Sequence, residues 1–162
     1  MPVVEEKPLV CVKYKLDKFM KDWRHCDEAS NYLAQLVSSF TNNPSYLSNM
    51  LSTVVNEFLE TIFHLKERRE YLIVEVLKLS DVVIIDFQLT LSEGNSKLFD
   101  SFFETISHSS SKDVYLTELM RIKNGEKAHR FIGLYEILSD YNIQLSRKIM
   151  SEKNHLRFQL DV

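Results

Sequence analysis

The chain has 162 residues, of which 44% are hydrophobic and 27% charged, and its formal net charge is −3. These values fit one globular domain that buries its own core, and they give no general attraction to nucleic acid or to an anionic membrane surface. The two cysteines match no zinc-binding spacing, and the opening residues lack the basic and long apolar regions of a signal peptide, so a reduced, cytoplasmic protein is expected.

The first part of the chain predicts one strand and two helices. Pro8–Tyr14 is rich in β-branched and aromatic residues and predicts an edge strand, because a proline opens it. Asp17–Phe40 carries apolar residues at helical spacing, and Pro44–Lys66 does so throughout its length. Asn43 before Pro44 is typical of a helix start.

Two hairpins are predicted farther along the chain. Tyr71–Leu79 and Val82–Leu89 are strand-like runs with two residues between them, as in a tight hairpin. The longest apolar run of the chain lies in the second of these strands and is far too short to cross a membrane. Ile132–Tyr141 predicts a helix, and Leu145–Ile149 with Leu156–Val162 predicts a closing hairpin.

The region from about residue 90 to 130 is the variable part of the pattern. Thr90–Ser96 predicts a polar loop, and Lys97–Ile106 and Asp113–Ile122 predict short helices joined by the polar tract Ser107–Lys112. Asn124–Arg130 predicts an irregular segment. Three phenylalanines of the first short helix are expected in the core beneath this insert, namely Phe99, Phe102 and Phe103. Long helices beside a sheet built largely from hairpins predict an α+β fold, a two-layer α/β sandwich with a mostly antiparallel mixed sheet and its helices on one face.

Polar residues follow one edge of the apolar stripe on the central helix. Glu57, Thr61 and His64 stand at i, i+4 and i+7, so they share one side of that helix. Two interpretations stay open. The residues form either the solvated border of a core helix or the catalytic or metal-binding edge of a cleft.

Two segments and the order of elements carry a resemblance to a known superfamily. The central VVNEFLETIFHLK and the late FIGLYEILSDYNIQLSRKIMSEKNHLRFQLDV resemble the ATP-binding (Bergerat) domain of the GHKL superfamily, which groups histidine kinases, gyrase-like ATPases and anti-sigma-factor serine kinases. The insert and the stretch Tyr115–Leu119 are similar to the SiaB-like bacterial regulators, which resemble anti-sigma kinases and act on small STAS-like proteins. The resemblance implies a single domain over residues 1–162, with a helical insert or lid at about 90–130.

The resemblance implies an ATP site in which several motif residues are replaced. The N box of the family falls on Asn56–Ile62, so Glu57 holds the acidic position that orients the attacking group, and Thr61 stands where a magnesium-binding Asn is expected. Asp86 is the candidate for the adenine-reading Asp, but no glycine follows it. The phosphate-facing glycine turn falls on Phe131–Tyr135 and keeps only Gly133, although backbone must approach a phosphate closely there.

Basic residues occupy the position of the family's lid. They are Arg121, Lys123, Lys127, His129 and Arg130. Arg130 and its neighbours could hold ATP phosphates or an acidic partner protein, and a solvated loop is the alternative.

The replaced motifs favour a regulatory protein over an enzyme. We expect a pseudokinase of bacterial signalling, non-catalytic or only weakly nucleotide-binding, that binds a STAS-like or sigma-pathway protein through Thr90–Arg130. It would need no cofactor, and it could dimerise through its first strand or first helix. The alternative is an active serine/threonine kinase dependent on ATP and Mg²⁺, with Glu57 positioning the nucleophile and a metal site rebuilt around Thr61 with Glu60 or Asp86. No P-loop or G-x-S-x-G motif supports another enzyme class.

Overall fold

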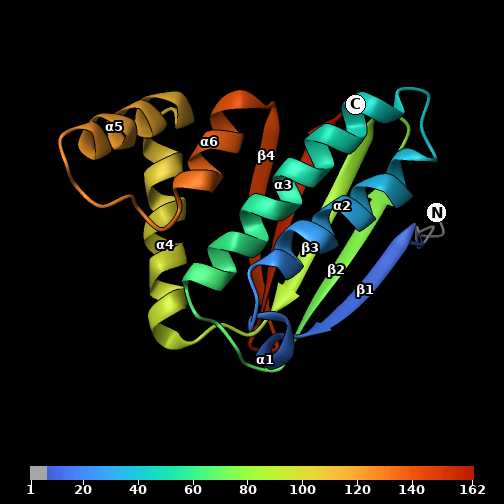
Figure 1. The fold of residues 1–162 in the computed structure, drawn as a ribbon, viewed down its shortest axis with the longest axis horizontal. Coiled ribbons are helices and arrows are strands. Elements are labelled where there is room, and N and C mark those ends of the chain that lie inside the picture. The colour runs from blue at the N-terminus through green and yellow to red at the C-terminus, as the bar shows by residue number, and fades with distance from the viewer. Residues whose placement is uncertain (1–6) are drawn as a thin grey trace.

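The computed structural model describes residues 7–162, which form one sheet with its helices on one face (Figure 1). The elements are β1 Val10–Lys15, α1 Leu16–Phe19, α2 Arg24–Ser38, α3 Pro44–His64, β2 Tyr71–Lys78, β3 Val82–Leu89, α4 Glu93–His108, α5 Ser111–Lys123, α6 Ile132–Asp140, β4 Ile143–Met150 and β5 Lys153–Asp161. The strand order is β1-β2-β3-β5-β4, and all four pairs are antiparallel. The two-layer α+β sandwich and both hairpins are confirmed. The parallel pair that a mixed sheet needs is not found within residues 7–162.

The helix α3 crosses the middle of the sheet and anchors the core. Its apolar stripe is buried from Leu47 to Ile62, as the sequence predicts, and Phe63 at the end of the stripe is half-buried. Phe58 stacks on Phe87 of β3 with 4.0 Å between ring centroids, and it meets the edge of Phe158 of β5 at 5.7 Å. All three rings are fully buried, so α3 is fixed to β3 and β5.

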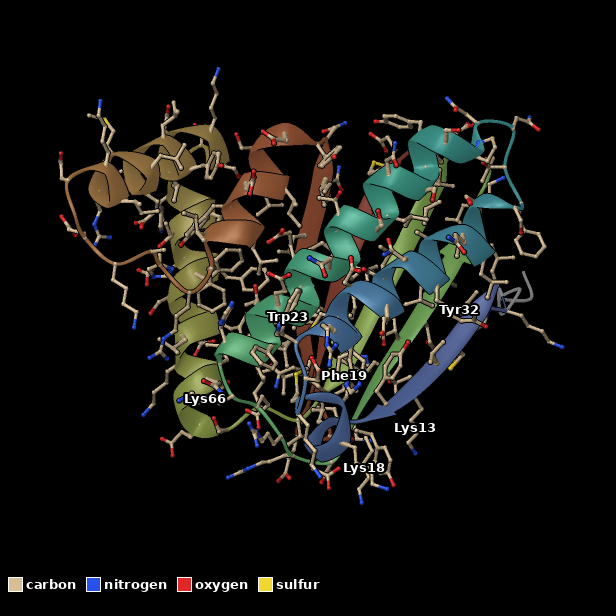
Figure 2. All side chains as sticks on the ribbon, viewed as in Figure 1. Lys13, Lys18, Phe19, Trp23, Tyr32 and Lys66 are labelled. Atoms are coloured by element: carbon tan, nitrogen blue, oxygen red, sulfur yellow. The ribbon has the colours of Figure 1, made fainter. Side chains whose placement is uncertain are left out.

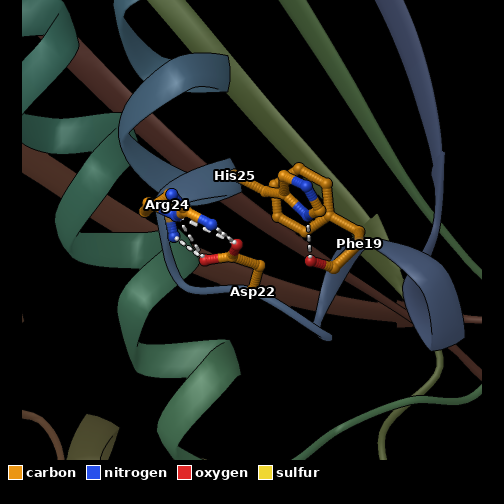
Figure 3. A network of polar contacts seen from close by, with 4 residues as sticks. All are labelled: Phe19, Asp22, Arg24 and His25. Carbon is orange, nitrogen blue, oxygen red and sulfur yellow. Dashed lines mark hydrogen bonds and ion pairs between the residues drawn. The ribbon is translucent and has the colours of Figure 1, made fainter.

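The predicted helix over Asp17–Phe40 is divided in two. The chain turns between α1 and α2, where the Arg24 side chain donates to both carboxylate oxygens of Asp22 (Figure 3). The His25 ring contacts the backbone oxygen of Phe19 at 2.8 Å in the same turn. Apolar spacing continues across this break, which is why periodicity alone predicts one helix.

The helix α4 begins inside the predicted polar loop, at Glu93. The Ser92 side chain accepts from the backbone N–H of Asn95, and this is a normal N-cap. The buried carboxylate of Glu67 adds two contacts, accepting from the backbone N–H of Ser92 at 2.7 Å and from the Asn95 side chain at 3.0 Å. The helix therefore starts earlier because a distant carboxylate completes its cap.

The insert packs as expected on its aromatic residues. Phe99 and Phe102 are fully buried and Phe103 is half-buried. Phe99 lies 5.0 Å from Phe131, between ring centroids, which joins α4 to the segment before α6. No helix within the described residues 7–162 is both long and apolar enough to cross a membrane.

Candidate functional site

A cleft of about 480 Å³ opens between the second half of α3 and the segment that leads into α6. Its walls come from four residues of α3, the residue Lys66 after it, and the stretch 127–133. The lining residues are Glu57, Glu60, Thr61, His64, Lys66, Lys127, Ala128, His129, Arg130, Ile132 and Gly133. The cleft thus brings together the polar edge of the central helix, the basic segment and the single retained glycine, which are far apart in sequence.

Glu57 and Gly133 are in direct contact where α3 approaches α6. A Cβ atom at position 133 would overlap Oε2 of Glu57 and lie 2.9 Å from its Cδ. Only glycine leaves room for the carboxyl group in this position. The first turn of α6 therefore faces a carboxyl group of the same chain.

The surroundings of Glu57 favour its neutral form. Burial raises its pKa to about 7, and the negative charges of Glu60 and Glu136 act in the same direction. A carboxyl group with such a pKa can take up or release a proton near neutral pH, and this property is common among catalytic groups and among buried structural carboxyls.

Thr61 and Glu60 are engaged within α3. The Thr61 side chain is buried and donates its hydroxyl hydrogen to the backbone oxygen of Glu57 at 2.8 Å. One carboxylate oxygen of Glu60 accepts from the Asn56 side chain at 2.9 Å. No group of three His, Cys, Asp or Glu side chains that could hold a metal ion is found in the described part of the chain. The Thr61 hydroxyl is thus engaged within its own helix, at the position where the resemblance implies a magnesium-binding Asn.

The basic residues of the lid position divide into two groups. Lys127 and Arg130 line the cleft and form no ion pair with any residue in the range 7–162. Arg121 instead pairs with Glu118 at 2.9 Å and with Glu126 at 2.8 Å. The exposed Lys123 ends α5 and lies outside the cleft lining.

His129 supports the start of α6 from within this segment. Its Nδ1 accepts from the backbone N–H of Phe131 at 3.1 Å, and burial lowers the pKa of its imidazole. The neutral ring is the form that can accept this hydrogen bond.

Asp86 does not join the cleft. Its neighbours Ile85 and Phe87 point toward the helices, so alternation along β3 turns Asp86 to the opposite face of the sheet. There its carboxylate accepts from Arg157 at 2.6 Å. The sheet therefore separates Asp86 from Glu57, and Asp86, the candidate for the adenine-reading Asp, is not among the residues that line the cleft.

Sequence reasoning did not find Glu136, one turn after Gly133 in α6, whose charge acts on Glu57. Its spacing of three residues from Gly133 on a predicted helix is a signal that could have placed it near the cleft.

No protein-family model and no curated protein matches this sequence. Among solved structures, the chain is similar to a chain in the crystal structure of the SiaB–SiaC complex from Pseudomonas aeruginosa. The TM-score is 0.64 at 13% sequence identity, over 97% of this chain and 92% of the other. The match shows a shared, SiaB-like fold, and at this identity function has to be argued from the site.

Proposed function

We propose that this chain is a signalling regulator that acts by binding a protein partner and does not depend on nucleotide turnover. The position of Glu57 carries the proposal. Its carboxyl group lies against Gly133 in the first turn of α6, where a bound phosphate would have to approach the backbone. In the anionic form it would also repel that phosphate.

The partner surface that we propose is the basic segment 124–130 with the adjoining end of α5. Lys127 and Arg130 are exposed and free of ion pairs with described residues, so their charges are available to an acidic surface. Arg121 and Lys123 extend this surface along α5. The similar chain comes from a complex of two proteins, SiaB and SiaC, and this supports a protein partner here. We propose a STAS-like protein or another component of a sigma-factor pathway.

The second candidate function is a serine/threonine kinase dependent on ATP and Mg²⁺. One observation favours it, since Glu57 has a pKa of about 7 and lines a cleft, as a general base would. Thr61 stands at the position of the magnesium-binding Asn, but its hydroxyl is buried and bonded within α3, and this makes the kinase the less favoured function.

Thermal unfolding with millimolar Mg-ATP or Mg-ADP separates the two functions. A nucleotide present at 100 times its Kd would add about 2.7 kcal/mol to the unfolding free energy and raise the Tm by roughly 5–11 °C. We expect no shift. A shift of that size, lost with EDTA and in Glu57→Ala, would overturn the proposal in favour of the kinase.

The partner surface is tested by affinity for the SiaC-like protein of the same organism. We expect Lys127→Glu with Arg130→Glu to weaken binding roughly tenfold, because both charges are reversed at the contact. The control is Lys112→Glu with Lys148→Glu, which makes the same change of charge at two exposed lysines outside the cleft. Equal affinities for the two double variants would contradict this surface.

A further inference from the structure

A second hollow, larger than the cleft, lies at the β1 side of the molecule. This groove has a volume of about 630 Å³ and is bounded by β1, α1 and the first half of α2. Its lining residues are Val12, Lys13, Tyr14, Lys15, Lys18, Phe19, His25, Glu28, Ala29 and Tyr32. Figure 2 shows Lys13, Lys18, Phe19 and Tyr32 on this side of the molecule. None of these residues belongs to the cleft or to the proposed partner surface.

The floor of the groove is a part of the sheet that the helices leave uncovered. Leu72 and Val74 of β2 are fully buried beneath the helical layer. Their cross-strand neighbours on β1, Tyr14 and Val12, face the same way but are only half-buried. The helical cover therefore ends at β2, and an apolar strip of β1 remains open toward the groove.

The outer backbone edge of β1 has no strand beside it within residues 7–162. The strand is the last in the sheet order, next to β2 only. The backbone N–H of Leu16 donates to the backbone oxygen of Glu70, just before β2. In the antiparallel register, every second residue from Val10 to Leu16 therefore forms its backbone hydrogen bonds on the side of β2. Cys11, Lys13 and Lys15 consequently turn their backbone groups outward, where an added strand can bind them.

The two faces of the β1 edge differ in chemistry. Aromatic rings of Tyr14, Phe19 and Tyr32 line the helix side, and the Tyr32 side chain is 59% exposed. Lys18 lies at the α1 end of the groove. Lys13 and Lys15 alternate with Val12 and Tyr14 and point to the other face of the sheet edge, where Nζ of Lys13 lies 4.1 Å from the ring centroid of Tyr71 and Nζ of Lys15 lies 3.8 Å from a carboxylate oxygen of Asp17. Three lysines stand against one glutamate among the lining residues, in a chain whose net charge is negative. The edge of the sheet at β1 is thus aromatic on the groove face and basic on the other face, on an acidic protein.

The turn between α1 and α2 holds this shape in place. His25 contacts the backbone oxygen of Phe19, and their rings lie 5.7 Å apart (Figure 3). Arg24 and Asp22 close the same turn through several hydrogen bonds, which lower the pKa of Asp22 to about 2. A groove that is already formed requires little ordering when a ligand binds.

We propose that this groove binds an extended acidic segment of another protein, which pairs with β1 as a sixth strand. Side chains alternate between the faces of a strand, so a segment paired with β1 would place every second side chain over Tyr14 and Phe19 and the others beside Lys13 and Lys15. The complementary sequence alternates apolar or aromatic residues with Asp or Glu.

A second copy of this chain fits the groove less well. Two β1 strands paired about a twofold axis would gather Lys13 and Lys15 of both copies on one face of the joined sheet, and like charges opposite one another are destabilising. Charge complementarity therefore favours an acidic strand from a different protein.

The probe for this proposal is the fluorescein-labelled peptide Glu-Val-Glu-Tyr-Glu-Val-Glu-Tyr, followed by fluorescence anisotropy. We expect saturable binding that is weakened roughly tenfold or more by Lys13→Glu with Lys18→Glu. The charge-matched control, Lys112→Glu with Lys148→Glu, should bind within about twofold of the wild type. Circular dichroism of each variant confirms that a loss of binding is not a loss of folding.

Two further peptides separate strand pairing from a general attraction of charges. A version methylated on alternate backbone nitrogens that would face β1 cannot donate to this strand, and it should bind roughly tenfold more weakly. A version with Lys in place of Glu should not bind.

Several results would overturn the proposal. They are the absence of saturable binding at about 1 mM peptide, equal affinity for the Glu and Lys peptides, no effect of methylation, and no effect of the Lys13 and Lys18 changes. Sedimentation that reveals a dimer disrupted by the same two changes would assign the groove to a second copy. Because the partner test above uses other residues, either proposal can fail while the other stands.

Discussion

The carboxyl group of Glu57 makes the stability of the fold depend on pH, because it is packed between two helices. It is half-buried between α3 and α6 and its pKa is raised to about 7, whereas an unfolded chain leaves a glutamate near its ordinary value of about 4.3. The folded state therefore binds more protons than the unfolded state between these two pH values. The stability contributed by the neutral form is fully present below pH 4 and is lost as pH rises through about 7.

Glu57→Gln should remove this dependence, because an amide has the same shape and does not ionise here. At pH 8 we expect the variant to be more stable than the wild type by about 1–2 kcal/mol, less than the full shift implies since the side chain is partly exposed. At pH 4 the two should be equal. Urea unfolding at both pH values measures this difference, with Glu104→Gln on the exposed side of α4 as the control. An unchanged pH dependence in Glu57→Gln would show that another group titrates.

The positions of individual site residues could be predicted from the sequence to different degrees. The spacing of Glu57, Thr61 and His64 was enough to place them on one side of a helix, and all three line the cleft. The face of Asp86 was harder to predict, because the run VVIIDFQL is apolar on both sides of its alternation. The contact between Glu57 and Gly133 joins positions far apart in sequence and depends on how α6 packs.

At the scale of elements, the regular segments were predictable and their breaks were not. The bounds of α3 and of the first hairpin lie within two residues of the predicted ones, since each has a long consistent period. The closing hairpin is longer than predicted. Its two-residue turn, Ser151 and Glu152, has positive φ at both positions but lacks the Asn-Gly signature of such turns.

The start of α4 could not be predicted from the residues around it, because part of its N-terminal cap comes from a distant residue. Glu67 follows α3, yet its carboxylate accepts hydrogen bonds from the backbone N–H of Ser92 and from the side-chain amide of Asn95. Because these contacts bridge a gap of about 25 residues, a search for local helix starts places the boundary too late.

Glu67→Ala should therefore loosen the first turn of α4. The change leaves the N–H of Ser92 without its buried acceptor, and we expect a loss of about 1–3 kcal/mol in unfolding free energy. Hydrogen exchange at residues 92–96 should rise more than in the rest of α4. Glu93→Ala is the matched control, since its ion pair with Lys97 is exposed and should contribute less than about 0.5 kcal/mol. Equal effects of the two changes would contradict the capping role of Glu67.

Across the whole molecule, the proposed partner surface borders the cleft, and the groove lies elsewhere on the same sandwich. The cleft lies between α3 and α6, and the groove lies between β1 and α2. The helices α2 and α3 run side by side across the sheet between them (Figure 1). If both proposals hold, the two partners would not compete for the same residues.

The packing of the helices on the sheet depends on Phe58, where α3 meets β3 and β5. Removing this ring would leave a cavity against Phe87 and Phe158, and Phe58→Ala should lower the unfolding free energy by about 3–5 kcal/mol. Since domains are stabilised by only about 5–15 kcal/mol, this change should lower the Tm by roughly 6–20 °C. Tyr46→Ala on the same helix is the control, because its ring is 51% exposed and should cost less than about 0.5 kcal/mol. Similar Tm values for the two variants would mean that α3 is held to the sheet by contacts other than the Phe58 ring.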